Sequence, residues 1–454
     1  MNDEELVTLV REQRDKVPLT IPVEEIIKRG RMLARHQRNR LVTRVTLVAL
    51  VLGGTGAFVS SRIGTPPSRP SPIAVRGHVS PPRTAPGWRL VADVNPAWQA
   101  VQAAGFEAGF SLVCPSTSTC YAENLPAPPG MQAEVEVTND GGNTWKRPEL
   151  PVALSSPTRL ACVDTDTCAI LGNDGAGNAT FLETTDGGQS WTASPGPSDL
   201  TSFAGLTELS CTTTASCVAL SSDPSGASGA AEAYTTDDGG DTWSESTLPP
   251  DFVPGALQCV LASTCVATGF FQSPDGSPTT PAGILYSTDS GVTWATASLP
   301  TASLTTLGLL TTRLSCADAS DCMASFFGKG GAARRDVLVS SDGGESWSQP
   351  EASGLGDDFI SGVSCLTAVQ CWASGIALPD ESGASGRVLA REGMISSTSD
   401  GGETWQNAQL PAGVGPVADI SCPTTTICYA LAFAPPAAGG AARPLTSVLL
   451  AYGS

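Results

Sequence analysis

The sequence predicts an all-β protein, a seven-bladed β-propeller preceded by a single transmembrane helix. Three observations lead to this fold class: an uncharged segment near the N-terminus, a motif that recurs about every 50 residues, and cysteine pairs that use every cysteine in the chain. A period near 50 residues, with short alternating runs between turn residues, suits a blade of four strands.

Composition excludes several classes of function. The chain has 454 residues, 41% of them hydrophobic and 15% charged, and its net charge of −19 argues against nucleic acid as a partner. Its two histidines, His36 and His78, both precede the repeats, so a His-ligated metal or a His-dependent catalytic pair cannot form there. We expect no metal and no cofactor.

The N-terminal region is predicted to cross a membrane. Residues 45–61 carry no charge and span roughly 26 Å as a helix, which is enough for a short membrane span. Basic residues dominate the end of the preceding segment, so residues 1–44 are expected in the cytoplasm. A cleaved signal peptide is the alternative, but its charged region would be unusually long. Residues 62–87 are rich in proline and suit an extracellular stalk, and the acidic propeller, residues 88–454, would follow outside the cell.

A motif ending in tryptophan defines the repeats. It occurs six times, with 46 to 58 residues between successive tryptophans: TNDGGNTW at 138–145, TTDGGQSW at 184–191, TDDGGDTW at 236–243, STDSGVTW at 287–294, SSDGGESW at 340–347 and TSDGGETW at 398–405.

Seven Cys-x5-Cys pairs alternate with this motif and leave no cysteine over: Cys114/Cys120, Cys162/Cys168, Cys211/Cys217, Cys259/Cys265, Cys316/Cys322, Cys365/Cys371 and Cys422/Cys428. This spacing does not suit a metal site, whereas two cysteines facing each other across a hairpin can be bridged. We expect one disulfide within each blade, and connections between blades are the alternative.

The mismatch between seven cysteine pairs and six motifs is explained by ring closure. The last pair is followed by one further strand pattern, LTSVLLAYGS, where the sequence ends. Trp88 stands 57 residues before Trp145, at the place of a seventh tryptophan. We therefore expect the strand after Gly87 to complete the last blade and leave no open sheet edge.

The repeated motif resembles the Asp-box (BNR) repeat of the sialidase-like propeller superfamily. The layout with paired cysteines is most similar to bacterial propellers related to photosystem II assembly/stability factors, here in a membrane-anchored form whose composition suggests an actinobacterium. The resemblance covers roughly residues 88–454. It is informative about the fold and poor for function, because one fold hosts many activities.

Structural roles are expected for the motif residues. The aspartates can accept backbone N–H groups of their own turns, and the tryptophans can pack between blades. A row of catalytic or calcium-binding carboxylates is the alternative, but one active site does not need six copies. The residues concerned are Asp140, Asp186, Asp238, Asp289, Asp342 and Asp400, with Trp145, Trp191, Trp243, Trp294, Trp347 and Trp405.

The Cys turns and the motif turns are expected on one face and the variable loops on the other, where binding usually lies. The position three residues before the first cysteine of each pair is expected near the channel mouth of that variable face. Four blades carry a charged residue there, and these are the candidate ligand-binding residues Arg159, Glu208, Arg313 and Asp419. The alternative is that they only pair with one another. Lys329, Arg334 and Arg335 are a candidate anion clamp, or simply a hydrophilic loop. Trp372 is a candidate for stacking on a sugar, or packs within its strand.

No recognisable catalytic set accompanies these candidates, so we assign no catalytic residue. The preferred function is recognition, without catalysis, of a cell-surface glycan or an exported protein. A sialidase-like glycoside hydrolase is one alternative, although neither the early arginine motif of that family nor a third arginine in register with Arg159 and Arg313 is found. A transmembrane sensor is the other. Within residues 1–44, the segment VPLTIPVEEIIKRGRMLARHQR at 17–38 loosely resembles tails of actinobacterial membrane proteins associated with sigma factors. The tail would then bind a cytoplasmic regulator rather than only orient the protein.

Overall fold

The structure is a computed structural model that describes residues 87–99, 110–124, 132–155, 158–198, 205–222, 231–261, 263–272, 282–300, 308–329, 335–352, 354–355, 358–377, 392–434 and 446–453. The chain divides into two units, 1–80 and 81–454, and every described residue belongs to the second. Within these ranges no helix has the length and apolar character needed to cross a bilayer. The expected cytoplasmic tail, the segment 45–61 and the stalk up to residue 86 lie outside the described residues.

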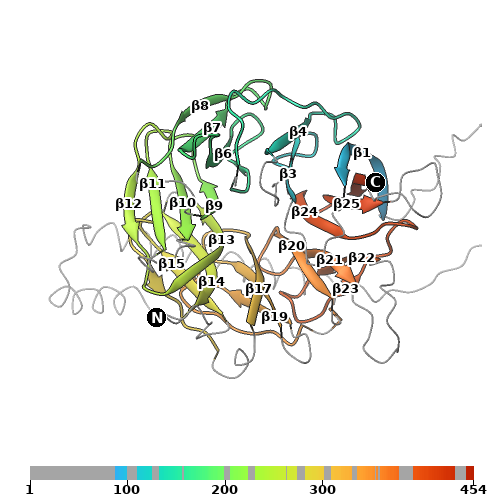
Figure 1. Ribbon diagram of the computed structural model, residues 1–454. Coiled ribbons are helices and arrows are strands. Elements are labelled where there is room, and N and C mark those ends of the chain that lie inside the picture. Colours follow the sequence, from blue (N-terminus) through green and yellow to red (C-terminus); the bar gives the residue numbers. More distant parts are fainter. Residues whose placement is uncertain are drawn as a thin grey trace, which may run out of the picture. The chain divides into compact units, whose positions relative to one another are not determined.

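Seven antiparallel sheets follow one another around a ring and form a β-propeller, as predicted (Figure 1). Blade 1 contains β2 (Phe110–Val113), β3 (Cys120–Asn124) and β4 (Glu134–Thr138). Blade 2 contains β5 (Ala161–Cys162), β6 (Cys168–Asn173), β7 (Ala179–Thr184) and β8 (Thr192–Pro195). Blade 3 contains β9 (Gly205–Cys211), β10 (Cys217–Ser222), β11 (Glu232–Thr236) and β12 (Ser244–Thr247). Blade 4 contains β13 (Phe252–Val260), β14 (Thr264–Phe271), β15 (Gly283–Ser287) and β16 (Ala295–Thr296).

The remaining blades repeat this order. Blade 5 contains β17 (Gly308–Cys316), β18 (Cys322–Lys329) and β19 (Arg335–Ser340). Blade 6 contains β20 (Phe359–Cys365), β21 (Cys371–Ala377), β22 (Glu392–Thr398) and β23 (Gln406–Asn407). Blade 7 contains β24 (Val417–Thr424), β25 (Ile427–Ala434), β26 (Thr446–Tyr452) and β1 (Trp88–Gln99).

The ring closes as the sequence predicts, with the N-terminal strand completing the C-terminal blade. β1 pairs antiparallel with β26, from Trp88 opposite Tyr452 to Gln99 opposite Thr446. Trp88 is buried and packs edge-on against Trp372 of blade 6, with ring centroids 5.8 Å apart. It therefore fills, between blades 6 and 7, the place that the motif tryptophans fill at other junctions.

The hydrophobic core is divided among the blade junctions, with one cluster of buried residues at each of the seven. The glycine two positions after the aspartate of each motif turn lets neighbouring blades approach closely. Gly240 has φ +89°, and a Cβ there would lie 2.8 Å from the Phe181 ring of blade 2. This glycine is therefore needed both for the turn and for packing against the preceding blade.

All seven Cys-x5-Cys pairs form disulfides within their own blades, which confirms the expected pairing over connections between blades. The paired Cα atoms lie 3.9 to 4.1 Å apart, across the first two strands of each blade. Each bridge closes a short loop whose five residues we call the Cys turn.

The bridges belong to the hydrophobic core rather than to an accessible site. The second cysteine of a pair begins or lies in the second strand, and four of these are almost fully buried, with at most 1% of their surface exposed: Cys120, Cys168, Cys265 and Cys428. Cys265 packs in the cluster between blades 3 and 4, and Cys428 in the cluster between blades 6 and 7. The spacing predicted the pairing but not this burial, which leaves these sulfur atoms a structural role and no contact with a ligand.

The six motif turns, which we call Asp turns, lie beside the Cys turns of the same blades. In every one of the six, a backbone N–H of the Asp turn donates to a carbonyl of the Cys turn, as from Gly141 N to Ser118 O at 2.8 Å. The other five bonds measure 2.9 to 3.0 Å. The expectation that both sets of turns share one face, which we call the turn face, is therefore confirmed.

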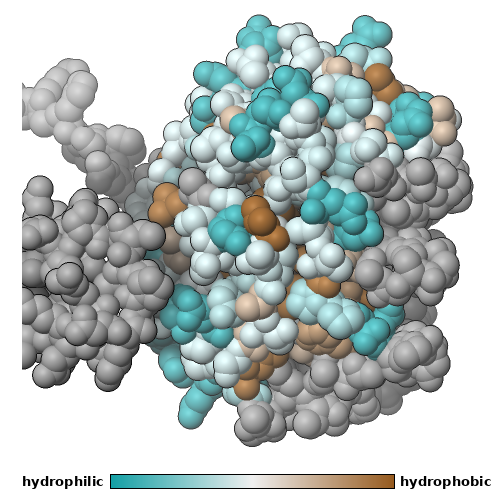
Figure 2. All heavy atoms as spheres, turned by 90° about the vertical axis from the view of Figure 1, so that its left-hand side faces the viewer, coloured by the Kyte–Doolittle hydropathy of each residue, from teal (hydrophilic) through white to brown (hydrophobic). Residues whose placement is uncertain are grey.

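Each Asp turn is held by the same internal hydrogen bonds. In blade 1, Asp140 Oδ1 accepts from Thr138 Oγ1 at 2.8 Å and from Thr144 N at 2.9 Å, and Asp140 Oδ2 accepts from Thr144 Oγ1 at 2.7 Å. The bond from the Thr144 hydroxyl is the main cause that lowers the pKa of Asp140. The side of the propeller shown in Figure 2 is mostly of intermediate hydropathy, with strongly hydrophilic and apolar residues scattered over it.

Candidate ligand-binding site in the central channel

A cavity of about 320 Å³ occupies the central channel, and the innermost strand regions of all seven blades contribute to its wall. Four of the sequence-predicted candidates, Arg159, Glu208, Arg313 and Asp419, line it together. They come from blades 2, 3, 5 and 7, at equivalent positions three residues before the first cysteine of each pair. The register of the repeat thus brings residues far apart in sequence into one site.

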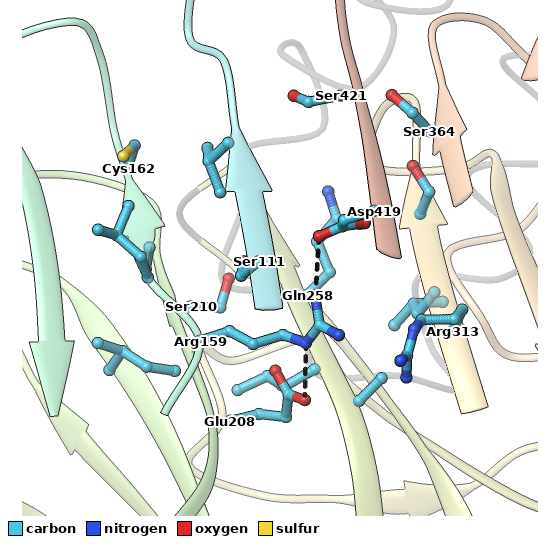
Figure 3. A pocket seen from close by; sticks show the side chains of 18 of the residues that line it. Ser111, Arg159, Cys162, Glu208, Ser210, Gln258, Arg313, Ser364, Asp419 and Ser421 are labelled. Carbon is cyan, nitrogen blue, oxygen red and sulfur yellow. Dashed lines mark hydrogen bonds and ion pairs between the residues drawn. The ribbon is translucent and has the colours of Figure 1, made fainter. Parts of the chain in front are cut away.

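Arg159 lies between two of these carboxylates (Figure 3). Its Nη1 is 3.1 Å from Asp419 Oδ2, and its Nε is 3.8 Å from Glu208 Oε1. Burial alone would lower the pKa of the Arg159 guanidinium, but Asp419 and Glu208 together raise it. Arg159 is therefore a charged link between blades 2, 3 and 7.

Backbone donors hold Asp419 in place. Its Oδ1 accepts from its neighbour Ile420 N at 2.9 Å, and its Oδ2 accepts from Leu112 N of blade 1 at 3.1 Å as well as from Arg159. The equivalent position in blade 6 is Gly362, where an added Cβ would lie only 2.5 Å from Asp419 Oδ1. Gly362 thus leaves the space that the carboxylate occupies.

Two buried glutamates hold their protons to unusually high pH. Burial raises the pKa of Glu208 to about 7, against the opposing influence of Arg159 and Arg313. Burial also raises the pKa of Glu123 to about 8. Glu123 Oε2 accepts from Leu160 N at 2.9 Å, while its Oε1 is buried with no hydrogen-bond partner in the described part of the chain.

Arg313 enters the same cavity from blade 5 and donates from Nε to the carbonyl oxygen of Ser361 in blade 6. Burial, together with repulsion from Arg159, lowers its pKa to about 10. It is still charged at neutral pH, so the cavity holds two guanidinium groups beside Glu208, whose carboxyl group is partly neutral at that pH.

Blade 2 differs from the other blades in the hydrogen bonds that join it to its neighbours around the channel. The same contact joins neighbouring blades at five of the seven junctions. The backbone N–H of the first cysteine in one blade donates a hydrogen bond to a side chain in the preceding blade, at 2.7 to 3.1 Å. The accepting residue is the one that directly precedes the first cysteine of that preceding blade. We call this contact the cysteine latch; its acceptors are Ser210, Gln258, Ser315, Ser364 and Ser421. At the two junctions of blade 2 the equivalent residues are Val113 and Ala161, whose side chains cannot accept a hydrogen bond. Arg159 and the Glu123–Leu160 bond connect blade 2 to its neighbours at these places.

Among the other candidates, Trp372 is the one whose side chain the structure describes. Trp372 is buried between blades 6 and 7 against Trp88 and Tyr452, in agreement with packing rather than sugar stacking. Arg334 lies outside the described residues, and Lys329 and Arg335 are strand ends whose side chains are not described. The variable loops expected on the other face are residues 224–232, 328–336, 379–393 and 435–444, and they also fall mostly or wholly outside the described residues. Among the described residues, no group of three or more His, Cys, Asp or Glu side chains is placed to hold a metal ion.

Sequence reasoning missed Glu123, Gly362 and the cysteine latch. Glu123 lies on β3, the second strand of blade 1, at the end away from the turn face. The four sequence-predicted residues were identified by their position on the first strand of a blade, so this pattern did not include Glu123. The latch was visible in principle, since serine or glutamine precedes the first cysteine in five repeats. Gly362 gave no signal in the sequence, because its role depends on a neighbour in the next blade.

Comparison with known proteins gives similarity of fold. No protein-family model matches the chain, and no curated protein matches it. Among solved structures, it is similar to YCF48 from Cyanidioschyzon merolae, at 13% identity over 81% of this chain and 98% of that one, with a TM-score of 0.48. It is also similar to a GH74 xyloglucanase from Xanthomonas campestris, at 14% identity over 80% of this chain and 55% of that one, with a TM-score of 0.48. A third similar structure is a Trypanosoma rangeli sialidase, at 14% identity over 76% of this chain and 54% of that one, with a TM-score of 0.41.

Proposed function

We propose that this chain is a membrane-anchored recognition module whose propeller lies outside the cell and binds a cell-surface glycan or an exported protein without catalysis. Seven disulfides, with no free cysteine among the described residues, support an oxidising compartment. The uncharged segment 45–61 and the proline-rich stalk support the anchor.

The observation that carries the non-catalytic assignment is the position of Arg159. Hydrolysis of a glycosidic bond by two carboxyl groups needs room for the substrate between them. Arg159 occupies the space between Glu208 and Asp419 and contacts both. Asp419 is also fixed by the backbone N–H groups of Leu112 and Ile420. These bonds make a rigid, polar channel wall, which suits recognition better than proton transfer.

Retention and product release, measured together, test this proposal. Oxidised full-length protein in detergent is incubated with immobilised cell-wall glycans, sialylated glycans and exported proteins. We expect retention of one of these classes and no release of soluble sugar. Release that is lost in Glu208→Gln would overturn the assignment.

A sialidase-like glycoside hydrolase is the second candidate. It is favoured by one observation, the pKa of Glu208 near 7, which is suitable for a general acid at neutral pH. In that case Glu208→Gln abolishes sugar release, whereas Glu183→Gln, on β7 of blade 2, leaves it unchanged.

A role for residues 1–44 in binding a cytoplasmic regulator such as a sigma factor is a separate proposal. The segment lies outside the described residues, and its basic amphipathic pattern is the support. Co-purification of a regulator with the full chain, but not with a chain lacking residues 2–44, would support it.

A further inference from the structure

Blade 4 departs from the repeat at both of its turns, and each departure exposes an apolar side chain. In the other six Cys turns, the residue two positions after the first cysteine is Ser, Thr or Asp, and its side-chain oxygen accepts a backbone N–H of the turn. In blade 4 this residue is Leu261, which cannot do so and is 68% exposed. The turn has thus lost a stabilising bond and gained an exposed leucine.

The Asp turn of blade 4 shows the same change. The residue three positions after the aspartate is Asn, Gln, Asp or Glu in the other five turns, but it is Val292 in blade 4, where it is 53% exposed. The two turns are joined by a hydrogen bond from Ser290 N to Ser263 O at 3.0 Å. Leu261 and Val292 therefore stand on neighbouring turns of one blade, and we call this pair the blade 4 tip.

The backbone at this tip is also unusual. Leu261 has φ +55° and Ser290 has φ +65°, and they are two of only four non-glycine residues with positive φ in the described ranges. Leucine rarely adopts this conformation, and such strain is characteristic of functional sites. Exposure, a lost hydrogen bond and strain all act against stability here, so stability does not explain these residues.

The charge around the tip identifies the kind of partner. The seven Cys turns and six Asp turns contain fourteen Asp or Glu residues, four in the Cys turns and ten in the Asp turns, and no Lys or Arg. None of these carboxylates is buried. An apolar tip within an acidic face complements a segment that carries apolar side chains beside Lys or Arg.

We propose that the blade 4 tip is a docking site for a cationic amphipathic segment of a partner protein. The apolar side of the segment would cover Leu261 and Val292, and its basic side chains would face the surrounding carboxylates. This site lies on the turn face, and it does not depend on the channel cavity or on its ligand.

Binding of a synthetic peptide to the full-length, oxidised protein in detergent tests the proposal. The probe is a fluorescein-labelled helical peptide of leucine and lysine with all leucines on one side; a peptide of the same composition with dispersed leucines is its control. The double variant L261T/V292E restores residue types found in the other blades. V369S is the matched control, since Val369 is 50% exposed in a Cys turn of blade 6.

The substitutions separate apolar docking from attraction by charge. V292E makes the face more acidic, so attraction by charge alone predicts tighter binding in the double variant. Docking on the tip predicts that the Kd rises about tenfold, as expected for losing the burial of two small apolar side chains. The proposal also expects V369S to bind like the original protein, and the thermal midpoint of L261T to be no lower.

Equal or tighter binding by L261T/V292E would overturn the proposal, as would failure of the original protein to distinguish the two peptides. Sedimentation analysis covers the remaining possibility. If the original protein self-associates and the double variant is monomeric, the tip is a contact between two copies of this chain, and the proposal of a cationic partner is wrong.

Discussion

Replacing Arg159 with methionine should destabilise the propeller strongly, because Arg159 connects blade 2 where the cysteine latch is missing. At an effective dielectric constant near 20, its contacts at 3.1 and 3.8 Å correspond to about 5 and 4 kcal/mol of Coulomb attraction. Desolvation of the three groups opposes much of this energy. Removing one partner of a buried ion pair nevertheless costs about 3–5 kcal/mol, since the remaining charge is left buried. Protonation of Glu208, whose pKa is near 7, reduces the loss toward the lower figure.

Unfolding of oxidised, full-length protein in guanidinium chloride at pH 7, followed by tryptophan fluorescence, measures this loss. Arg147→Met is the matched control, because Arg147 also bridges two carboxylates, Glu134 and Glu136, at 2.7 and 3.0 Å, but its side chain is 44% exposed. We expect that control to lose less than about 1 kcal/mol. The double variant R159M/D419N should recover part of the stability, because it also removes the buried Asp419 carboxylate that has lost its ion-pair partner.

The reasoning is refuted if Arg159→Met costs no more than Arg147→Met. A ligand-binding role alone would give that result, with intact stability and weakened binding. The interpretation of Arg159 as a structural link would then be wrong, and the argument against a catalytic carboxyl pair would lose its basis.

Three further predictions concern the same ring. First, Glu123 and Glu208 have folded-state pKa values of about 8 and 7, above the ordinary 4.5, so the folded protein holds protons that the unfolded chain releases. The stability that comes from binding these protons is complete below pH 4.5 and is lost as the pH rises toward 8. Thermal midpoints should therefore fall between pH 5 and pH 9, and Glu123→Gln should reduce the fall; an unchanged fall would contradict this. Second, Gly362→Ala should cost about 2–3 kcal/mol, because its Cβ would lie 2.5 Å from Asp419 Oδ1 and 2.8 Å from Ser374 Oγ, whereas Gly175→Ala, with nothing within 4 Å, should be neutral in denaturant unfolding. Third, replacing both Cys211 and Cys217 with serine should cost about 2 kcal/mol by the loop-entropy relation, and equal denaturation midpoints for this variant and the original protein would contradict it.

Much of the fold could be predicted from the sequence because the repeat makes each feature visible several times. The spacing of Trp88 to Trp145 and the excess cysteine pair were enough to predict the closure through β1, and the Cys-x5-Cys spacing was enough to predict bridges within blades. The common register of Arg159, Glu208, Arg313 and Asp419 likewise predicted that they would meet in the channel.

The arrangement inside the cavity was beyond sequence reasoning for physical reasons. Whether Arg159 reaches Asp419 across blade 1 depends on the curvature of the ring and on the space above Gly362, and neither is encoded in a local pattern. Glu123 comes from a different strand, so the repeat register did not identify it. Its high pKa depends on burial, which only the assembled junction creates.

The way the ring closes has a consequence for the order of folding. Each disulfide joins cysteines six positions apart, so it can form as soon as its own hairpin emerges. The closing pair, by contrast, joins Trp88 to Tyr452, and β1 must wait for almost the whole chain before it gains its partner strand. We therefore expect early, independent oxidation of all seven cysteine pairs and slow pairing of β1 with β26. Until closure, the edges of β1 and β26 are open to other chains. A pulse-chase experiment on the expressed protein should therefore find the disulfides first and resistance to protease last.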